Sequence, residues 1–145
     1  VLTQNPIAIS IESNIHGNDL TSRIRFVSKE SLVDHKIVVY LTEDNLIADQ
    51  ANYLNFDENS YFYGMGNPII DYSHEDVLRY SFTDILGDEI LNSLALSENV
   101  IYFDLDMSQF DFNLENTNII AIIVNSDNLA LNSQSARVGE FQDFN

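Results

Sequence analysis

The chain has 145 residues, 45% of them hydrophobic, and it contains no cysteine. This length suits one globular domain with a buried core, over residues 1–145, and the missing cysteine excludes disulfides, thiolate catalysis and cysteine-based metal sites. Asp and Glu number 23 against six Lys and Arg, a net charge of −17 that repels phosphate backbones and anionic lipids, so we expect neither nucleic acid nor a membrane surface as a partner of this domain.

The first half of the chain shows the alternation of apolar and polar residues that is typical of half-buried β-strands. Residues 7–12 and 20–26 both follow it, and the turn-forming cluster 16–19 lies between them, which predicts an antiparallel pair. Residues 35–44 are continuously apolar in their middle and predict a central strand. The next segment, 44–54, fits either a capped helical turn or an alternating strand.

The second half of the chain continues the strand pattern. Strands are expected at four places: 77–83, 100–106, 118–125 and, as a short final strand, 135–141. In the first of these, the inward side chains are predicted to be Leu78, Tyr80 and Phe82. Residues 85–96 fit a bulged strand or a loop.

Six to eight short strands with few helix signals predict a mainly β fold, an antiparallel two-sheet sandwich of the immunoglobulin-like type. Such sandwiches need only about 100 residues, so the remaining length must lie in insertions. The obvious insertion is the aromatic-rich segment from about Asn55 to Tyr72, which is longer than a structureless connection usually is.

The insertion is a candidate binding surface, because aromatic rings with Met and Gly recur at recognition sites and loops on a rigid scaffold commonly carry function. The alternative is that the rings cover one end or edge of the sandwich as part of its core. The sequence leaves both interpretations open. The candidate binding residues are Tyr61, Phe62, Tyr63, Met65 and Tyr72.

A second candidate is a cluster of ionisable residues at the ends of two predicted strands. Strand parity places Glu43 beside His74 at the rim of the core, and Asp44 beside Arg79 on the opposite face. A histidine near a carboxylate can act as acid and base near neutral pH, although such pairs more often tie a loop to a sheet. No nucleophile, zinc-protease or phosphate-loop motif accompanies them.

Metal binding has weaker support in the sequence. Asp104, Asp106, Gln109 and Asp111 supply hard oxygen ligands, but they lack the glycine and terminal glutamate of an EF-hand loop. No two histidines have the spacing of zinc ligands. We therefore predict no metal and no cofactor, and calcium on the acidic face stays an open alternative.

Two motifs resemble the C-terminal domain of the twenty-eight-kilodalton outer-membrane lipoprotein family of Gram-negative anaerobes. The matching residues are Val39, Tyr40, Leu41, Thr42, Glu43, Asp44 and Gln50, followed by Tyr72, His74, Val77, Leu78 and Arg79. The likeness runs from about Lys36 to Val138 and includes 118–125, which is similar to the penultimate strand of these domains. Glu75 and Asp76 stand where the family pattern would have a second histidine, which argues against a two-histidine metal site.

The resemblance implies an immunoglobulin-like sandwich on a lipid-anchored outer-membrane protein, with an adhesin or receptor role and no established catalytic residues. The chain begins without the basic and apolar regions of a signal peptide, so we expect a domain excised from a longer lipoprotein, anchored through an upstream segment. We predict a non-enzymatic binding module at the cell surface, with a protein or glycan partner. The alternatives are a hydrolase that uses Glu43 and His74, and a structural spacer for an upstream domain.

Overall fold

The structure, a computed structural model, describes residues 6–145 and consists almost entirely of antiparallel β-strands. The strands are β1 (Ile7–His16), β2 (Asp19–Ser28), β3 (Lys36–Glu43), β4 (Leu46–Gln50), β5 (Ile69–His74), β6 (Val77–Ser81), β7 (Asp88–Glu89), β8 (Glu98–Asp106), β9 (Thr117–Val124), β10 (Ala130–Arg137) and β11 (Phe141–Gln142). Two 3₁₀ turns, Met107–Gln109 and Leu114–Asn116, are the only helices among the described residues. Neither of them has the length or the apolar character needed to cross a bilayer.

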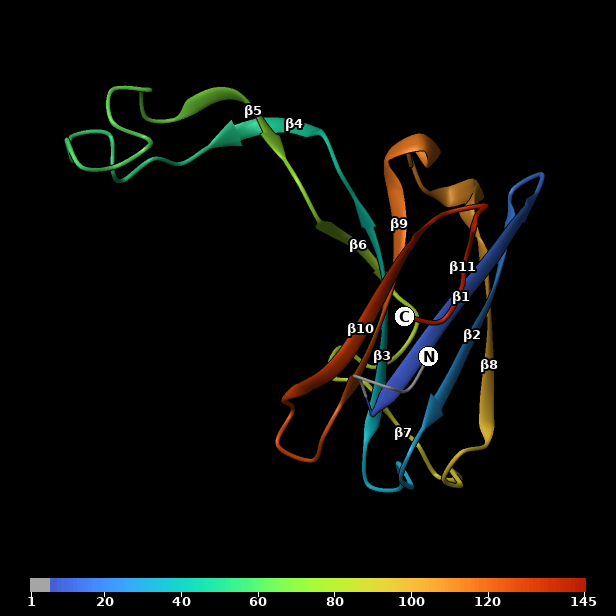
Figure 1. The fold of residues 1–145 in the computed structure, drawn as a ribbon. Coiled ribbons are helices and arrows are strands. Elements are labelled where there is room, and N and C mark those ends of the chain that lie inside the picture. The colour runs from blue at the N-terminus through green and yellow to red at the C-terminus, as the bar shows by residue number, and fades with distance from the viewer. Residues whose placement is uncertain (1–5) are drawn as a thin grey trace.

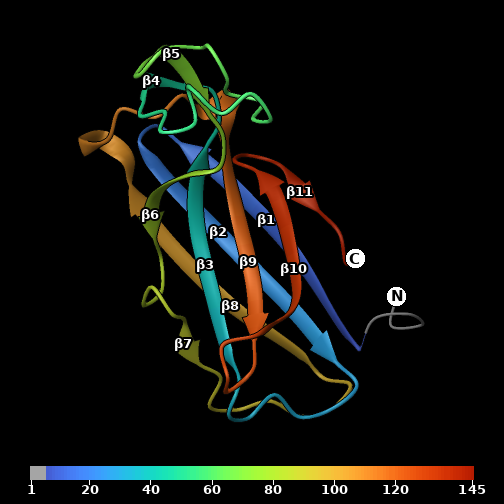
Figure 2. The same ribbon diagram turned by 90° about the vertical axis from the view of Figure 1, so that its left-hand side faces the viewer.

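Two sheets face each other, as Figures 1 and 2 show. The first has the strand order β11-β1-β2-β8, and the second has the order β10-β9-β3-β6, with the short β7 also paired to β3. This arrangement confirms the predicted antiparallel two-sheet sandwich. The predicted first hairpin is confirmed as β1–β2, and β3 is central, with β9 on one side and β6 and β7 on the other.

The core fills the space between the two sheets with alternating side chains from the long strands. Each such side chain stabilises the fold by about 1.5–3 kcal/mol relative to leaving it in water. The almost fully buried apolar residues include Ile9, Ile11, Leu20, Ile24, Phe26, Ile37, Val39, Leu41, Ile119, Ala121 and Ile123.

The outer face of β1 is also covered, which the alternation did not predict. Ser10, which alternates with the core residues Ile9 and Ile11, is completely buried, and its hydroxyl accepts a hydrogen bond from Arg25 at 3.0 Å. The Arg25 guanidinium lies over the rings of Phe141 and Phe144, 5.8 and 4.9 Å from their centroids. The C-terminal chain therefore extends the sheet at the edge of β1, and its rings help to cover the outer face through Arg25; the predicted short final strand is replaced by the longer β10 followed by β11.

A bulge in β6 breaks the predicted alternation. Leu41 pairs with Tyr80 and Thr42 pairs with Leu78, so Arg79 is an extra residue in the strand. Tyr80 packs against the core as predicted, but Leu78 is 45% exposed, and its predicted inward orientation is wrong. The rings of Tyr80, Phe82, Phe103 and Phe110 close this edge of the sandwich with centroid separations of 5.2 to 5.8 Å.

The hairpin β4–β5 projects from one end of the sandwich (Figure 1). We call residues 46–74, which include both strands and the loop between them, the arm. The arm leaves the second sheet where β3 ends and returns to it where β6 begins. Residues 44–54 therefore enter a strand rather than a helical turn, and the aromatic-rich insertion neither caps nor edges the sandwich.

Gly87 occupies a position that only glycine fits without strain. Its φ is +91°, and a Cβ added there would lie 2.9 Å from the Ile37 carbonyl oxygen and from Val38 Cγ2. Gly17 also has positive φ, +63°, but has open space around it. We expect Gly87→Ala to lower the free energy of unfolding by about 2 kcal/mol and Gly17→Ala by about 1 kcal/mol, measured by urea denaturation. Equal losses would show that the close approach to β3 does not matter.

Candidate functional site

The loop at the tip of the arm is organised around one buried amide side chain. Asn52 is 4% exposed, and its Nδ2 donates to the carbonyl oxygens of Phe62 and Gly66, both at 2.9 Å. Its Oδ1 accepts from the Leu54 N–H at 3.1 Å, and its own N–H donates to Asn67 Oδ1 at 3.0 Å. Because buried amides need such partners, Asn52 gives the loop a defined shape from hydrogen bonds within the arm.

Four rings pack edge to face along the arm. The centroid separations are 5.3 Å for Tyr61 and Phe62, 6.3 Å for Phe62 and Tyr72, and 5.0 Å for Tyr72 and His74. Such contacts stabilise an element beyond the area that they bury. His74 therefore lies against Tyr72 in the arm, and its predicted pairing with Glu43 is wrong, since the carboxylate of Glu43 has other partners.

Three rings of the arm are largely open to solvent, including Tyr61, which contacts Phe62 through one edge. Tyr53, Phe56 and Tyr61 are 90%, 88% and 81% exposed, which is unusual for side chains of this size. Tyr63, Met65, Ile47 and Ile70 are also exposed. Large apolar side chains that gather on one exposed element are a feature of interaction sites, which makes the arm a candidate site.

The five predicted binding residues divide into two groups. Tyr61, Tyr63 and Met65 are exposed, whereas Phe62 and Tyr72 are half-buried by the ring contacts within the arm. Sequence reasoning missed the most exposed ring, Tyr53, because it lies just before the assigned start of the insertion. The signal was present: Tyr53-Leu54-Asn55-Phe56 contains no strand alternation and several turn-forming neighbours.

A cavity of about 380 Å³ opens within the arm. This volume lies within the usual range of small ligand pockets, and it suffices for one large side chain or a comparable group. Aromatic and aliphatic side chains dominate the lining, and two amides accompany them. Its lining includes Gln50, Asn52, Tyr53, Leu54, Phe62 and Tyr72.

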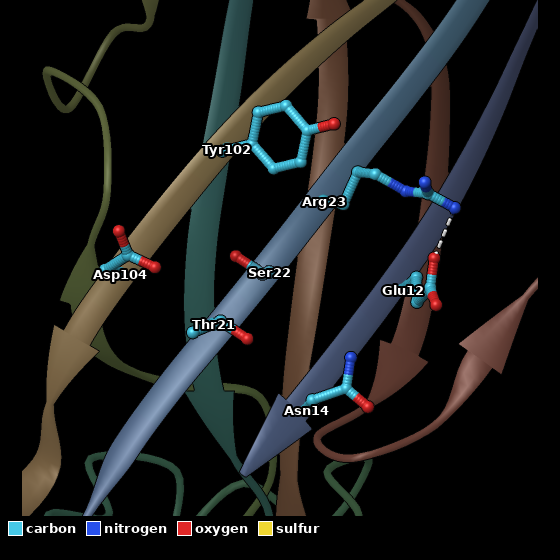
Figure 3. A pocket seen from close by; sticks show the side chains of 7 residues that line it. All are labelled: Glu12, Asn14, Thr21, Ser22, Arg23, Tyr102 and Asp104. Carbon is cyan, nitrogen blue, oxygen red and sulfur yellow. Dashed lines mark ion pairs between the residues drawn. The ribbon is translucent and has the colours of Figure 1, made fainter. Parts of the chain in front are cut away.

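A smaller cavity, of about 220 Å³, lies on the outer face of the first sheet (Figure 3). Its side chains come from β1, β2 and β8, and they include Glu12, Asn14, Thr21, Arg23, Tyr102 and Asp104. Glu12 and Arg23 form an ion pair at 2.5 Å with both side chains more than a third exposed, so the pair contributes little to stability. These residues are the ordinary polar outer face of a sheet, and the arm is the better candidate site.

Glu43 is a structural anchor at the base of the arm. It is 2% exposed, its Oε2 pairs with the Arg79 guanidinium, and its Oε1 accepts from the Asn113 N–H at 2.8 Å. Arg79 also donates to the Asp111 carbonyl oxygen at 3.2 Å and lies 5.2 Å from the Phe112 ring centroid. The Glu43 carboxylate thus ties β6 and the chain before β9 to the end of β3.

Asp44 has a different set of partners from the predicted one. Its Oδ1 accepts from the Asp76 N–H and its Oδ2 accepts from Asn118 Nδ2, both at 2.9 Å. The predicted pairing of Asp44 with Arg79 is wrong, because the bulge moves Arg79 to the face of Glu43. The structure therefore brings Glu43 and Arg79 together, and it does not assemble the carboxylate and histidine pair that a hydrolase would need.

One of the acidic residues considered for calcium, Asp106, caps a 3₁₀ turn. Asp106 accepts from the Ser108 N–H at 2.9 Å at the start of the first 3₁₀ turn. Hydrogen bonds from the backbone and hydroxyl of Ser108 lower the pKa of Asp106. Within residues 6–145, no three His, Asp or Glu side chains form a group suited to a metal ion.

Comparison with known proteins identifies the family. Among solved structures, HBP35 of Porphyromonas gingivalis is similar, with a TM-score of 0.63 and 15% sequence identity. The likeness covers 92% of this chain and 41% of that one, so the chain spans less than half of its length, and at this identity the likeness shows the fold alone. Curated proteins gave no match. Residues 2–142 match the family described as Outer membrane protein Omp28, and the chain therefore belongs to that family of outer membrane proteins.

Proposed function

We propose that this protein is a non-enzymatic binding module displayed at the cell surface, with the arm as its recognition element. The observation that carries the proposal is the exposure of Tyr53, Phe56 and Tyr61 on a hairpin that projects from the sandwich. Burying these rings against the sandwich would have stabilised the fold. Aromatic side chains left in solvent on an ordered loop are typical of the residues that anchor protein interfaces.

The family places the protein at the outer membrane, and the finer details belong to the proposal. The domain is immunoglobulin-like, part of a longer lipoprotein, and it is held to the membrane by a lipid-anchored segment upstream of Val1. Its net charge of −17 repels anionic lipid and favours display away from the membrane surface. Its role is that of an adhesin or receptor, and its partner is a protein or glycan at the cell surface.

The two alternative functions have less support from the geometry. A hydrolase would need Glu43 to act with His74. The Glu43 carboxylate instead pairs with Arg79 and accepts a hydrogen bond from the Asn113 N–H at the base of the arm. The structural spacer required a smooth, charged surface without apolar patches. The exposed rings of the arm favour recognition over a spacer.

Replacing the three most exposed rings of the arm tests the proposal. We expect the triple variant Tyr53→Ala, Phe56→Ala and Tyr61→Ala to lose binding by roughly tenfold or more, because buried aromatic anchors each contribute at least about 1 kcal/mol at interfaces. Its melting temperature should stay close to the wild type, since these rings are mostly exposed and the lost Tyr61–Phe62 contact lies within the arm, not in the sandwich. Binding is measured against immobilised extracellular proteins and glycans.

A matched control removes exposed apolar side chains from the sandwich instead. The variant Leu91→Ala, Leu94→Ala and Tyr102→Ala changes residues that are 73%, 73% and 68% exposed and lie outside the arm. We expect it to bind as the wild type does. If the arm variant binds as well as the wild type, or if both variants lose binding equally, the arm is not the recognition element.

A further inference from the structure

We infer that the partner of the arm is an extended, cationic polypeptide segment, an inference that rests on the proposed function and names the chemistry of its ligand. Three independent features of the arm support it: a purely acidic charge, exposed rings beside carboxylates, and unpaired strand edges. Together they select a polypeptide over a glycan and a cationic partner over a second copy of this chain.

The charge of the arm has one sign. Residues 44–76, the arm with its base, hold seven of the 23 Asp and Glu residues and none of the six Lys and Arg. Four of these carboxylates lie on the arm itself, all exposed: Asp49, Asp57, Glu58 and Asp71. Within the ~8 Å screening length of physiological salt, they attract cations and repel acidic glycans. A second copy, with the same net charge of −17, is repelled as well.

The exposed rings suit arginine or lysine side chains. Phe56, whose ring is 88% exposed, directly precedes the exposed carboxylates Asp57 and Glu58 in the chain. Aromatic faces attract guanidinium and ammonium groups, most strongly where water is displaced. The aromatic and aliphatic lining of the 380 Å³ cavity suits the methylene stem of such a side chain, while its charged head stays near solvent.

The strand edges of the arm suit a polypeptide. β4 and β5 form a two-stranded sheet, and within residues 6–145 neither strand pairs with a third. Each strand therefore presents an outer edge, interrupted by the register shift between Ala48 and Gln50 and by the positive φ of Asp71, and a short extended segment can add to its regular part. A glycan cannot continue such a ladder. A segment that alternates cationic and apolar residues would use the backbone edge, the carboxylates and the rings at once.

A short synthetic peptide that alternates arginine with leucine tests the inference. We expect it to bind the wild type, and to bind more weakly as NaCl is raised. The variant Asp49→Asn, Asp57→Asn and Glu58→Gln should weaken binding by about tenfold, since it removes three of the four exposed carboxylates of the arm. The amide oxygens keep the acceptors that the N–H groups of Asp71 and Asn59 use at 3.3 and 3.0 Å.

A control variant with the same net charge separates the arm from the general acidity of the chain. Glu89→Gln, Asp104→Asn and Asp127→Asn remove three exposed carboxylates outside the arm. We expect this variant to bind the peptide within about twofold of the wild type, because screening confines the effect of exposed charges to their surroundings. A peptide with glutamine in place of arginine should bind much more weakly than the arginine peptide.

Any of four outcomes would overturn the inference. Equal losses in the two charge variants would show unspecific attraction to an acidic protein. Sedimentation that detects a dimer lost in the triple ring variant would identify a second copy as the occupant. Arm-dependent binding of immobilised glycans, without binding of the arginine peptide, would also overturn it and yet leave the proposed function intact. If no probe depends on the arm, both proposals fail.

Discussion

Glu43→Ala is expected to lower the free energy of unfolding by about 3 kcal/mol, the low end of the range for removing one partner of a buried ion pair. The change leaves the Arg79 guanidinium without its carboxylate and the Asn113 N–H without its acceptor. The low end applies because the Arg79 side chain is still 23% exposed to water. Urea denaturation of the purified domain measures the loss.

The exposed ion pair on the first sheet supplies the control. Glu12→Ala breaks the pair with Arg23, whose side chains are 36% and 40% exposed, and it should cost at most about 1 kcal/mol. A Glu43→Ala variant as stable as Glu12→Ala would contradict the anchoring role. If Glu43→Ala kept full stability but lost a hydrolytic activity of the domain, Glu43 would instead be a catalytic residue.

Asn52→Ala is expected to disorder the tip of the arm without unfolding the sandwich. It removes the donors to the Phe62 and Gly66 carbonyl oxygens and the acceptor for the Leu54 N–H, each worth about 1 kcal/mol net. Amide hydrogen exchange should accelerate across the loop, while the amides of β2 keep their protection, because local and global opening are separate events. Binding through the arm should fall with the loss of shape.

Asn59 in the same loop provides a matched asparagine. It is exposed, and its Nδ2 makes a 3.4 Å contact with Asp57 Oδ1, so Asn59→Ala should change exchange in the loop only slightly. If Asn52→Ala lowers the midpoint of global unfolding and leaves loop exchange unchanged, the loop does not act as a separate unit of stability.

Most of the fold was predictable from the sequence, because a sandwich core demands alternation along every long strand. Residues 20–26 show this most clearly, with Leu20, Ile24 and Phe26 fully buried on one face. The predictions that the structure contradicts have local causes. The bulge at Arg79 inserts one residue into β6, which turns Leu78 outward and exchanges the partners of the ionisable cluster. Alternation carries no signal for such an insertion.

The site was predictable only in outline. Composition identified an aromatic insertion, but the same residues are compatible with core packing and with an exposed surface. The exposure of Tyr53, Phe56 and Tyr61 decides between them, and the hydrogen bonds of Asn52 explain how the loop keeps its shape without the sandwich. Tyr53 was missed because residues 44–54 fit two periodicities and were kept apart from the insertion, which was taken to start at Asn55.

Deleting the arm tests the central claim, that it is a self-contained recognition element and not part of the sandwich core. In this variant, a pair of glycines replaces residues 46–74. Asp44 and Asp76 stay in place, and a short turn connects β3 to β6. We expect a cooperative thermal transition close to that of the intact domain, together with loss of arm-dependent binding. A domain that is unfolded without these residues would show that the rings of the arm hold the sandwich together, and it would contradict the account.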